Sequence, residues 1–159
     1  MNEPNLDIEN IIREYIDKSL HMSLATCVDN KPWVCELHFT YDDNLNVYWR
    51  SRANGRHCQE IALNPFVAGD IVKQHSIEEY PHAIYFEGKA ELVEDESKYP
   101  EIADLFIKRQ IGDVSIIEDA KKEDGKKIYK LTVANWYAFG KFEGDKGQKY
   151  TLKWNGGNK

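Results

Sequence analysis

The chain has 159 residues, of which 42% are hydrophobic and 12% aromatic, and this is enough for one globular domain with a substantial core. Its formal net charge of -6 at pH 7 argues against a general nucleic-acid or anionic-membrane binder, because such proteins need a broad excess of positive potential. No apolar run approaches the roughly 20 residues of a membrane helix, and the acidic N-terminus is unlike a signal peptide, so we expect a cytoplasmic protein.

The N-terminal third of the chain predicts one helix followed by three strands. Apolar residues recur at helical spacing over residues 6–20, so the N-terminal helix is expected within residues 1–20. After residue 20 the period changes to alternation, and short turns rich in Asp and Asn separate the runs. The predicted strands are residues 21–28, 33–41 and 45–51. Because their connections are too short for parallel crossovers, these strands are expected to pair antiparallel.

The rest of the chain predicts two more helices and further strands. A short helix should run over residues 56–64, because Pro65 disfavours helix at the residue before it. A second helix is expected over residues 97–112, and Gly88 should mark a bulge in a long strand. The predicted strands are residues 66–73, 82–94, 127–136 and 137–143. The Gly-Asn tail, residues 155–159, is expected to be frayed.

Together these elements predict a mainly β (α+β) fold. The chain shows no internal repeat and no linker, so we expect a single domain over residues 1–159. An antiparallel barrel of about six or seven strands, with flanking helices, fits this pattern better than a doubly wound parallel sheet.

The stretch WRSRANGRHCQE, residues 49–60, concentrates positive charge in an otherwise acidic chain. Three of the five arginines lie here, together with His57. A phosphate is held well by Arg forks, hydroxyls and backbone N–H groups at the start of a helix, and this stretch offers each of them. The turn can equally be a hydrated surface hairpin, and the residues alone leave both interpretations open.

Other motifs narrow the chemistry. The sequence has no GxxxxGK[ST], HExxH, GxSxG or CxxC motif and no GxGxxG at a strand-to-helix junction, so nucleoside triphosphate, Rossmann and hydrolytic chemistry lack support. The three cysteines are expected to be reduced thiols. A zinc site from Cys35, His38, His57 and Cys58 is disfavoured, because residues three apart in a strand point to opposite faces. No catalytic residue is identified.

A series of short motifs runs in order through residues 20–95. They are Leu24-Ala25-Thr26, Pro32, Val47-Tyr48-Trp49, Arg56-His57 and Asn64-Pro65-Phe66-Val67. This series resembles the FMN-binding split-barrel superfamily typified by pyridoxamine 5'-phosphate oxidase, and it implies a six-stranded split barrel. The C-terminal part resembles a bacterial branch of the superfamily that carries no assigned substrate. The Arg-x-His that the oxidase itself carries near its C-terminus is missing, so vitamin B6 oxidation is not expected.

The resemblance implies a binding site for FMN and no metal site. Arg56 and His57, with Arg50 or Ser51, would hold the phosphate, and the other residues would lie near the flavin ring. The implied cofactor-binding residues are Cys35, Glu36, Leu37, His38, Arg50, Ser51, Arg56, His57 and Ala83.

The ring would lie along the second predicted strand, with Glu36 and His38 on the face toward it. The resemblance also implies a homodimer with FMN at the subunit interface. Trp136 or Lys141 of the partner subunit would then complete the site.

The function implied by the resemblance is that of an FMN-dependent oxidoreductase acting on a small molecule, with NADH or NADPH as a candidate electron donor. Neither nucleic acid nor a membrane is expected as a partner. Two alternatives stay open at this point: a module that binds FMN or haem without turning anything over, and a dimer with no ligand.

Overall fold

The computed structural model describes residues 7–142 and 146–154, and the predicted tail over 155–159 lies outside these ranges. Its helices are α1 (Ile8–Asp17), α2 (Arg56–Leu63), α3 (Tyr99–Lys108) and α4 (Ser115–Lys121), with a short 3₁₀ helix, η1 (Glu96–Lys98). Its strands are β1 (His21–Val28), β2 (Lys31–His38), β3 (Thr40–Tyr41), β4 (Val47–Arg52), β5 (Phe66–Val72), β6 (Ala83–Leu92), β7 (Lys126–Gly140) and β8 (Gln148–Lys153). None of the helices in the described ranges is long and apolar enough to cross a bilayer.

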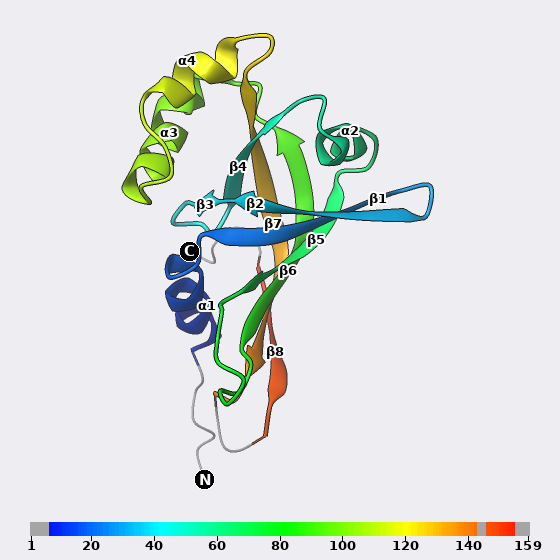
Figure 1. Cartoon of the computed structure of the whole chain (residues 1–159), viewed down its shortest axis with the longest axis vertical. Helices are drawn as coiled ribbons and strands as arrows, with labels where there is room; N and C mark the ends of the chain where they lie inside the picture. The colour runs from blue at the N-terminus through cyan, green and yellow to red at the C-terminus, as the bar shows by residue number, and fades with distance from the viewer. Residues whose placement is uncertain (1–6, 143–145, 155–159) are drawn as a thin grey trace.

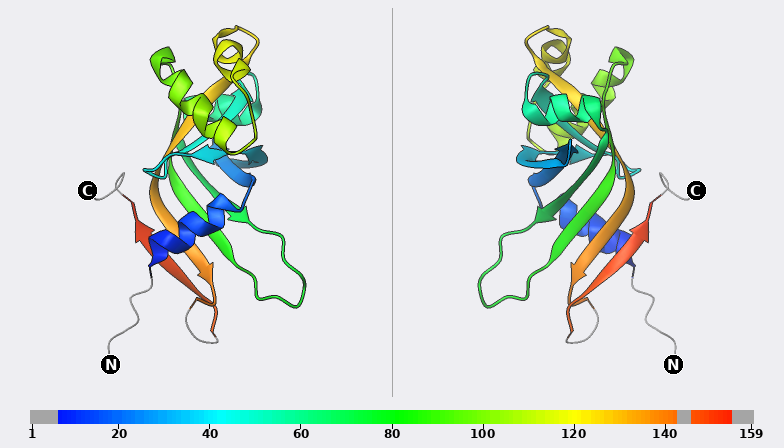
Figure 2. Two further views of the ribbon diagram at one scale, coloured as in Figure 1. Left: turned by 90° about the vertical axis from the view of Figure 1, so that its left-hand side faces the viewer. Right: turned by 90° about the vertical axis from the view of Figure 1, so that its right-hand side faces the viewer.

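All strands belong to one antiparallel sheet, which curls into a half-barrel (Figures 1 and 2). The sheet order is β2-β1-β5-β6-β7-β4-β3, and β8 pairs with β7 outside this path. The predicted mainly β (α+β) class, with antiparallel strands and flanking helices, is confirmed. The sheet has eight strands where about six or seven were expected: β3 is a separate two-residue strand and β8 was not predicted, while the strands predicted over residues 127–136 and 137–143 form the single strand β7.

The curl follows from the way the chain leaves β2. The sequence predicted one strand over residues 33–41, but β2 ends at His38 and β3 begins at Thr40. These two strands lie at opposite ends of the sheet path, and only Phe39 separates them. Phe39 is fully buried, so its side chain fills the interior while the chain passes from one edge of the sheet to the other. A flat sheet could not bring its two edges within one residue of each other.

A bulge explains why the longest strand was predicted as two. β7 runs for 15 residues, but its buried positions change phase near Ala134, which imitates the end of one strand and the start of another. The register with β6 shifts at Glu87 and Gly88, where Ala134 is the extra residue. The predicted irregularity at Gly88 is therefore confirmed, although the extra residue lies opposite it on β7, and a Cβ on Gly88 would lie 2.2 Å from the Thr132 carbonyl oxygen.

The core has two parts. The larger lies inside the half-barrel, where the fully buried side chains of Trp49 and Trp136 are the largest. The smaller lies between the sheet and the helices α3 and α4, which sit together at one end of the molecule (Figure 1). The sequence predicted one helix over 97–112, whereas the chain forms η1 and α3 and then α4, which was not predicted. α1 packs beside β6, β7 and β8.

Candidate functional site

The turn between β4 and α2 brings Ser51 and His57 together. Ser51, near the end of β4, is 7% exposed, and its Oγ lies 2.8 Å from Nε2 of His57 in the first turn of α2. A hydrogen bond of 2.9 Å from the Gly55 N–H to the Arg52 carbonyl closes the turn between them. A strand end, a tight turn and a helix start thus place a hydroxyl beside an imidazole.

The first turn of α2 has the features of an anion site. Gly55 is the N-cap and provides no side-chain hydrogen bond, and the first turn contains no acidic residue. The first intrahelical bond runs from Gln59 N–H to the Gly55 carbonyl at 3.1 Å, so the three N–H groups before it have no partner within the helix. Such N–H groups, with the positive end of the helix dipole, favour an anion.

His57 is half-buried, and its environment disfavours the imidazolium form. Burial lowers the pKa of His57 below its ordinary value, although the nearby Glu60 carboxylate acts in the opposite direction. At neutral pH the ring is therefore neutral and shares a hydrogen bond with Ser51, with the donor set by the tautomer. An arriving anion would add a charge that favours protonation of this ring.

Arg56 contacts one neighbour on α2 and one on β2, and a residue of β1 holds the first of these. Its Nε donates to Oε1 of Glu60 at 2.7 Å, and its guanidinium carbon lies 4.4 Å from the centroid of the Trp33 ring. Thr26 donates from its hydroxyl to the other carboxylate oxygen of Glu60. The hydrogen bonds from Thr26 and Arg56 hold the pKa of Glu60 below its ordinary value, so the carboxylate is charged.

Arg50 points away from this group. Its Nη2 lies 2.6 Å from Oδ2 of Asp119 on α4, and Arg52 donates to the Asp124 carbonyl at 3.2 Å. Successive residues of a strand face opposite sides, so Ser51 faces α2 while Arg50 faces α4. Of the two phosphate contacts that the sequence left open at this strand end, the chain places only Ser51 beside His57.

The predicted ring contacts of β2 are divided between two faces. Cys35 and Leu37 are half-buried and face the interior, and burial, followed by Cys58 and Glu60, raises the pKa of the Cys35 thiol to about 11. Glu36 and His38 are exposed on the opposite face, where the His38 ring lies 4.2 Å from the ring of His21. Glu36 and His38, the two residues expected on the face toward the ring, thus share one face of β2, and Cys35 and Leu37 lie on the other.

The backbone of β2 offers a different kind of contact. β2 ends the sheet path, so β1 is its one neighbour among the described strands. The two-residue turn over 29–30 has positive φ at both positions, and Phe39 N–H bonds to the Leu20 carbonyl at 3.3 Å beyond the other end of the pair. The turn and the Phe39 bond together determine which residues of β2 hydrogen-bond to β1 and which point their backbone groups away from it. The residues whose N–H and C=O groups point away from β1 are Val34, Glu36 and His38.

Ala83 lies far from the other candidates within one chain. It begins β6 and pairs with Phe139, whereas the other end of β6 pairs with Tyr129, beside the β4 residues near Ser51. A strand of this length separates its ends by roughly 30 Å. Trp136 is fully buried, so the expectation that it reaches a partner's site is wrong, and Lys141 lies over the Tyr80 ring at 4.5 Å.

Three residues of the Arg56 surroundings were missed in the sequence: Thr26, Trp33 and Glu60. Thr26 and Trp33 are directly opposite each other on β1 and β2, and this register cannot be read without the turn geometry. The spacing of Arg56 and Glu60, four residues apart on a predicted helix, was the one available signal.

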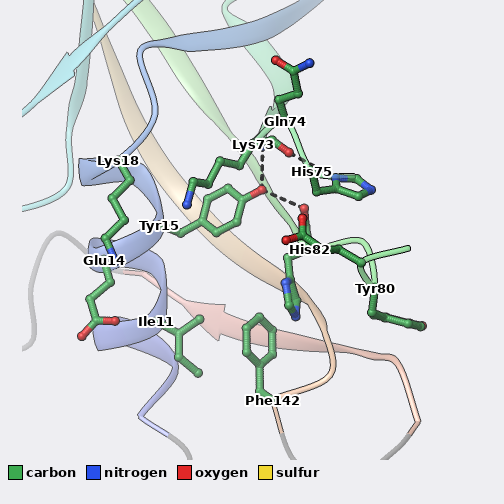
Figure 3. Close-up of a pocket in the computed structure, with 11 residues that line it drawn as sticks. Ile11, Glu14, Tyr15, Lys18, Lys73, Gln74, His75, Tyr80, His82 and Phe142 are labelled. Carbon is green, nitrogen blue, oxygen red and sulfur yellow. Dashed lines mark hydrogen bonds between the residues drawn. The ribbon is translucent and has the colours of Figure 1, made fainter. Parts of the chain in front are cut away.

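A separate cleft of about 560 Å³ lies between α1 and the loop over residues 73–82 (Figure 3). At its centre the Tyr15 hydroxyl accepts a hydrogen bond from Lys73 N–H and donates one to the His82 carbonyl, both at 2.7 Å. These bonds tie the two ends of the loop to α1. The predicted site residues do not line this cleft, although His82 directly precedes Ala83.

Comparisons with known proteins agree with this architecture. The family model described as pyridoxamine 5'-phosphate oxidase matches residues 8–140. A comparison with curated protein sequences gives no match.

Solved structures with the same fold come from several bacteria. Campylobacter jejuni ChuZ aligns with a TM-score of 0.75 at 20% identity, over 95% of this chain and 61% of that one. General stress protein 26 of Bacillus anthracis aligns with a TM-score of 0.66 at 16% identity, over 93% and 99% of the two chains. HutZ of Vibrio cholerae, a haem storage protein, aligns with a TM-score of 0.65 at 17% identity, over 80% and 91%.

The placement of Arg50 predicts a structural role. Its partner Asp119 is subject to opposing effects: burial raises its pKa, but the Lys126 N–H and Arg50 together hold the pKa below its ordinary value. Replacing Arg50→Ala should lower the free energy of unfolding in urea by about 1–3 kcal/mol, because a partly buried charged group loses its partner. Flavin affinity should stay within twofold of the wild type. A stable Arg50→Ala variant that no longer binds flavin would show that Arg50 is part of the binding site.

Proposed function

The chain belongs to the pyridoxamine 5'-phosphate oxidase family, and from that premise we propose that it is an FMN-binding flavoprotein that acts as an oxidoreductase on a small molecule. The observation that carries the proposal is the uncapped, cationic first turn of α2 next to Ser51. A helix start without an acidic residue or a capping side chain is less stable by itself, and a bound anion stabilises it.

The residues present fit the phosphate end of FMN. Ser51 would contribute a hydroxyl, Arg56 its two Nη groups and α2 its free N–H groups. Arg56 brings one positive charge, which Glu60 partly offsets, so a phosphate dianion would still lack at least one positive charge. A proton on His57 would supply it.

The outer edge of β2 fits the flavin end. Flavins carry hydrogen-bond donors and acceptors along one side of a planar ring, and the outward backbone groups of Glu36 and His38 form a complementary row. In this arrangement Glu36 and His38 contribute through their main chain. When bound, FMN supplies hydride transfer, so the chain's own residues need only anchor the phosphate, orient the ring and exclude water.

A second copy of the chain would provide the missing wall of the site. The outer face of β5, β6 and β7 carries a groove of about 810 Å³ over Gly88, and Phe66 at its side is 62% exposed. Exposed apolar surface of this kind is typical of an interface. We place the homodimer contact on this face.

Haem is the rival ligand. HutZ, which has the same fold, is a haem storage protein, and this chain carries the exposed His21–His38 pair on β1 and β2. Neutral imidazoles are haem ligands, so the pair gives the alternative a concrete location. The absorption spectrum of the purified protein separates the two ligands, because flavin and haem absorb at different wavelengths.

The first prediction concerns the cofactor and Arg56. The protein should purify yellow or become yellow with added FMN, and Arg56→Ala should weaken FMN binding by about 1.5–3 kcal/mol, the usual value for a charge-assisted hydrogen bond. Flavin fluorescence titration measures this, with Arg52→Ala as the control from the same turn. A Soret band in place of a flavin spectrum, or equal affinities for Arg56→Ala and the wild type, would contradict the proposal.

The second prediction concerns pH. Because burial lowers the pKa of His57 in the free protein and a phosphate would raise it, FMN binding should take up a proton. Affinity should therefore fall as pH rises from about 7 to 8.5, a range in which the phosphate stays dianionic, with a slope that approaches tenfold per pH unit.

Two comparisons isolate His57 as the source of that slope. His57→Lys should flatten it, because lysine stays charged across the range. Riboflavin, which has no phosphate, should show no slope with the wild type. A slope that persists in His57→Lys would assign the proton to another group.

The third prediction concerns assembly. Sedimentation velocity should show a dimer, and Phe66→Glu should shift it toward monomer and weaken FMN binding, because a charge would be buried in the proposed interface. Ile77→Glu is the matched control, since Ile77 is fully exposed on the loop before β6. If both variants remain dimeric, the interface lies on another face.

A further inference from the structure

Four side chains from three elements form a compact group at the start of α2. Thr26 and Trp33 face each other across β1 and β2, and Arg56 and Glu60 lie one turn apart on α2. The spacing of a cross-strand pair is close to that of side chains four apart on a helix. Thr26 therefore meets Glu60 while Trp33 meets Arg56.

Each oxygen of Glu60 has its own partner. One accepts from the Thr26 hydroxyl and the other from Nε of Arg56 at 2.7 Å. Thr26 is 2% exposed, so its hydroxyl has little access to water and is committed to this carboxylate. The Glu60 side chain is 12% exposed, whereas that of Arg56 is 48% exposed. Thr26 and Glu60 are therefore shielded from solvent, whereas the Arg56 guanidinium is accessible to a ligand.

The order of the two charges along the helix is the reverse of the favourable one. A helix is stabilised by an acidic residue in its first turn and a basic one later, and ion pairs four apart are stronger in that order. α2 has Arg56 first and Glu60 a turn later, without an acidic residue in its first turn. Helix stability alone gives no reason for this arrangement.

The contacts leave one side of the Arg56 guanidinium free. The guanidinium carbon lies over the Trp33 ring and Glu60 accepts from Nε, so two contacts restrain the position of the group. In the described part of the chain no hydrogen bond engages Nη1 or Nη2 of Arg56. These two nitrogens can together hold two oxygens of a tetrahedral anion.

We propose that Thr26 and Glu60 are positioning residues, which hold Arg56 over Trp33 with both Nη groups open to a terminal phosphate. The inference rests on the proposed phosphate site. Through Arg56, the buried Thr26 would make the site prefer a phosphorylated flavin to riboflavin. Thr26 itself contacts no ligand.

The binding test compares Thr26→Val, which keeps the shape and removes the donor, with Thr26→Ser, which keeps the donor. Thr26→Val should weaken FMN binding about three- to tenfold, the range for one lost hydrogen bond. Riboflavin affinity should not change, and Thr26→Ser should stay close to the wild type. In an Arg56→Ala background, Thr26→Val should have no further effect on FMN.

A purely structural clamp between α2 and β1 predicts a different pattern. Loss of such a clamp would weaken FMN and riboflavin alike, and the loss would persist in the Arg56→Ala background. Either result would overturn the proposal.

A second measurement needs no flavin. In the free, ¹⁵N-labelled protein at mildly acidic pH, the Arg56 Nε–H should give an NMR signal protected from exchange, identified by its loss in Arg56→Ala. The signal should persist in Thr26→Ser and broaden or vanish in Thr26→Val. An unchanged signal in Thr26→Val would show that Thr26 does not hold Arg56. If the wild type binds no FMN at all, the phosphate site fails, while this signal still decides the positioning of Arg56.

Discussion

The start of α2 is held in an arrangement that an isolated helix would avoid, and the rest of the site depends on it. Gly55 offers no capping side chain, and the charged Arg56 stands at the positive end of the helix dipole, next to the neutral ring of His57. Such a charge typically costs a few tenths to about 1 kcal/mol. Every neighbouring element is arranged around this turn: β4 delivers Ser51, and β1 and β2 deliver Thr26 and Trp33. A bound anion would turn this unfavourable charge into a favourable contact.

Strand alternation divides the positive charge that is so conspicuous in the sequence. Arg50 and Arg52 face the α4 side, where they bind Asp119 and the Asp124 carbonyl and hold the end of the sheet to that helix. Arg56 and Ser51 belong to the α2 side. The clustering of arginines in this turn therefore has two causes, one structural and one that points to a ligand. A linear reading cannot separate them, because residues adjacent in a strand are on opposite faces.

Local patterns predicted the elements well where local rules decide them. β1 and α2 begin where the change of period and the Asn-Gly turn indicate, and α2 ends one residue before the predicted limit at Asn64. Prediction failed where a distant partner decides. The bulge at Ala134 carries β7 through a phase change that looked like a turn, and β8 exists because β7 offers it an edge. In the site, Thr26 and Glu60 could not be found because their contact requires both the register of β1 with β2 and the packing of α2 on that pair.

One topological feature sets both ends of the proposed site. Because only Phe39 separates β2 from β3, and these lie at opposite ends of the sheet path, curling of the sheet is obligatory. β2 stays at an edge, where none of the described strands pairs with its outer backbone groups. The same edge strand carries Trp33 beneath Arg56. A ligand with an anionic end at α2 and a planar, hydrogen-bonding end along β2 therefore meets two surfaces that are fixed to one another through a single strand. Haem offers two carboxylates but no row of ring donors and acceptors, so this combination favours a phosphorylated flavin.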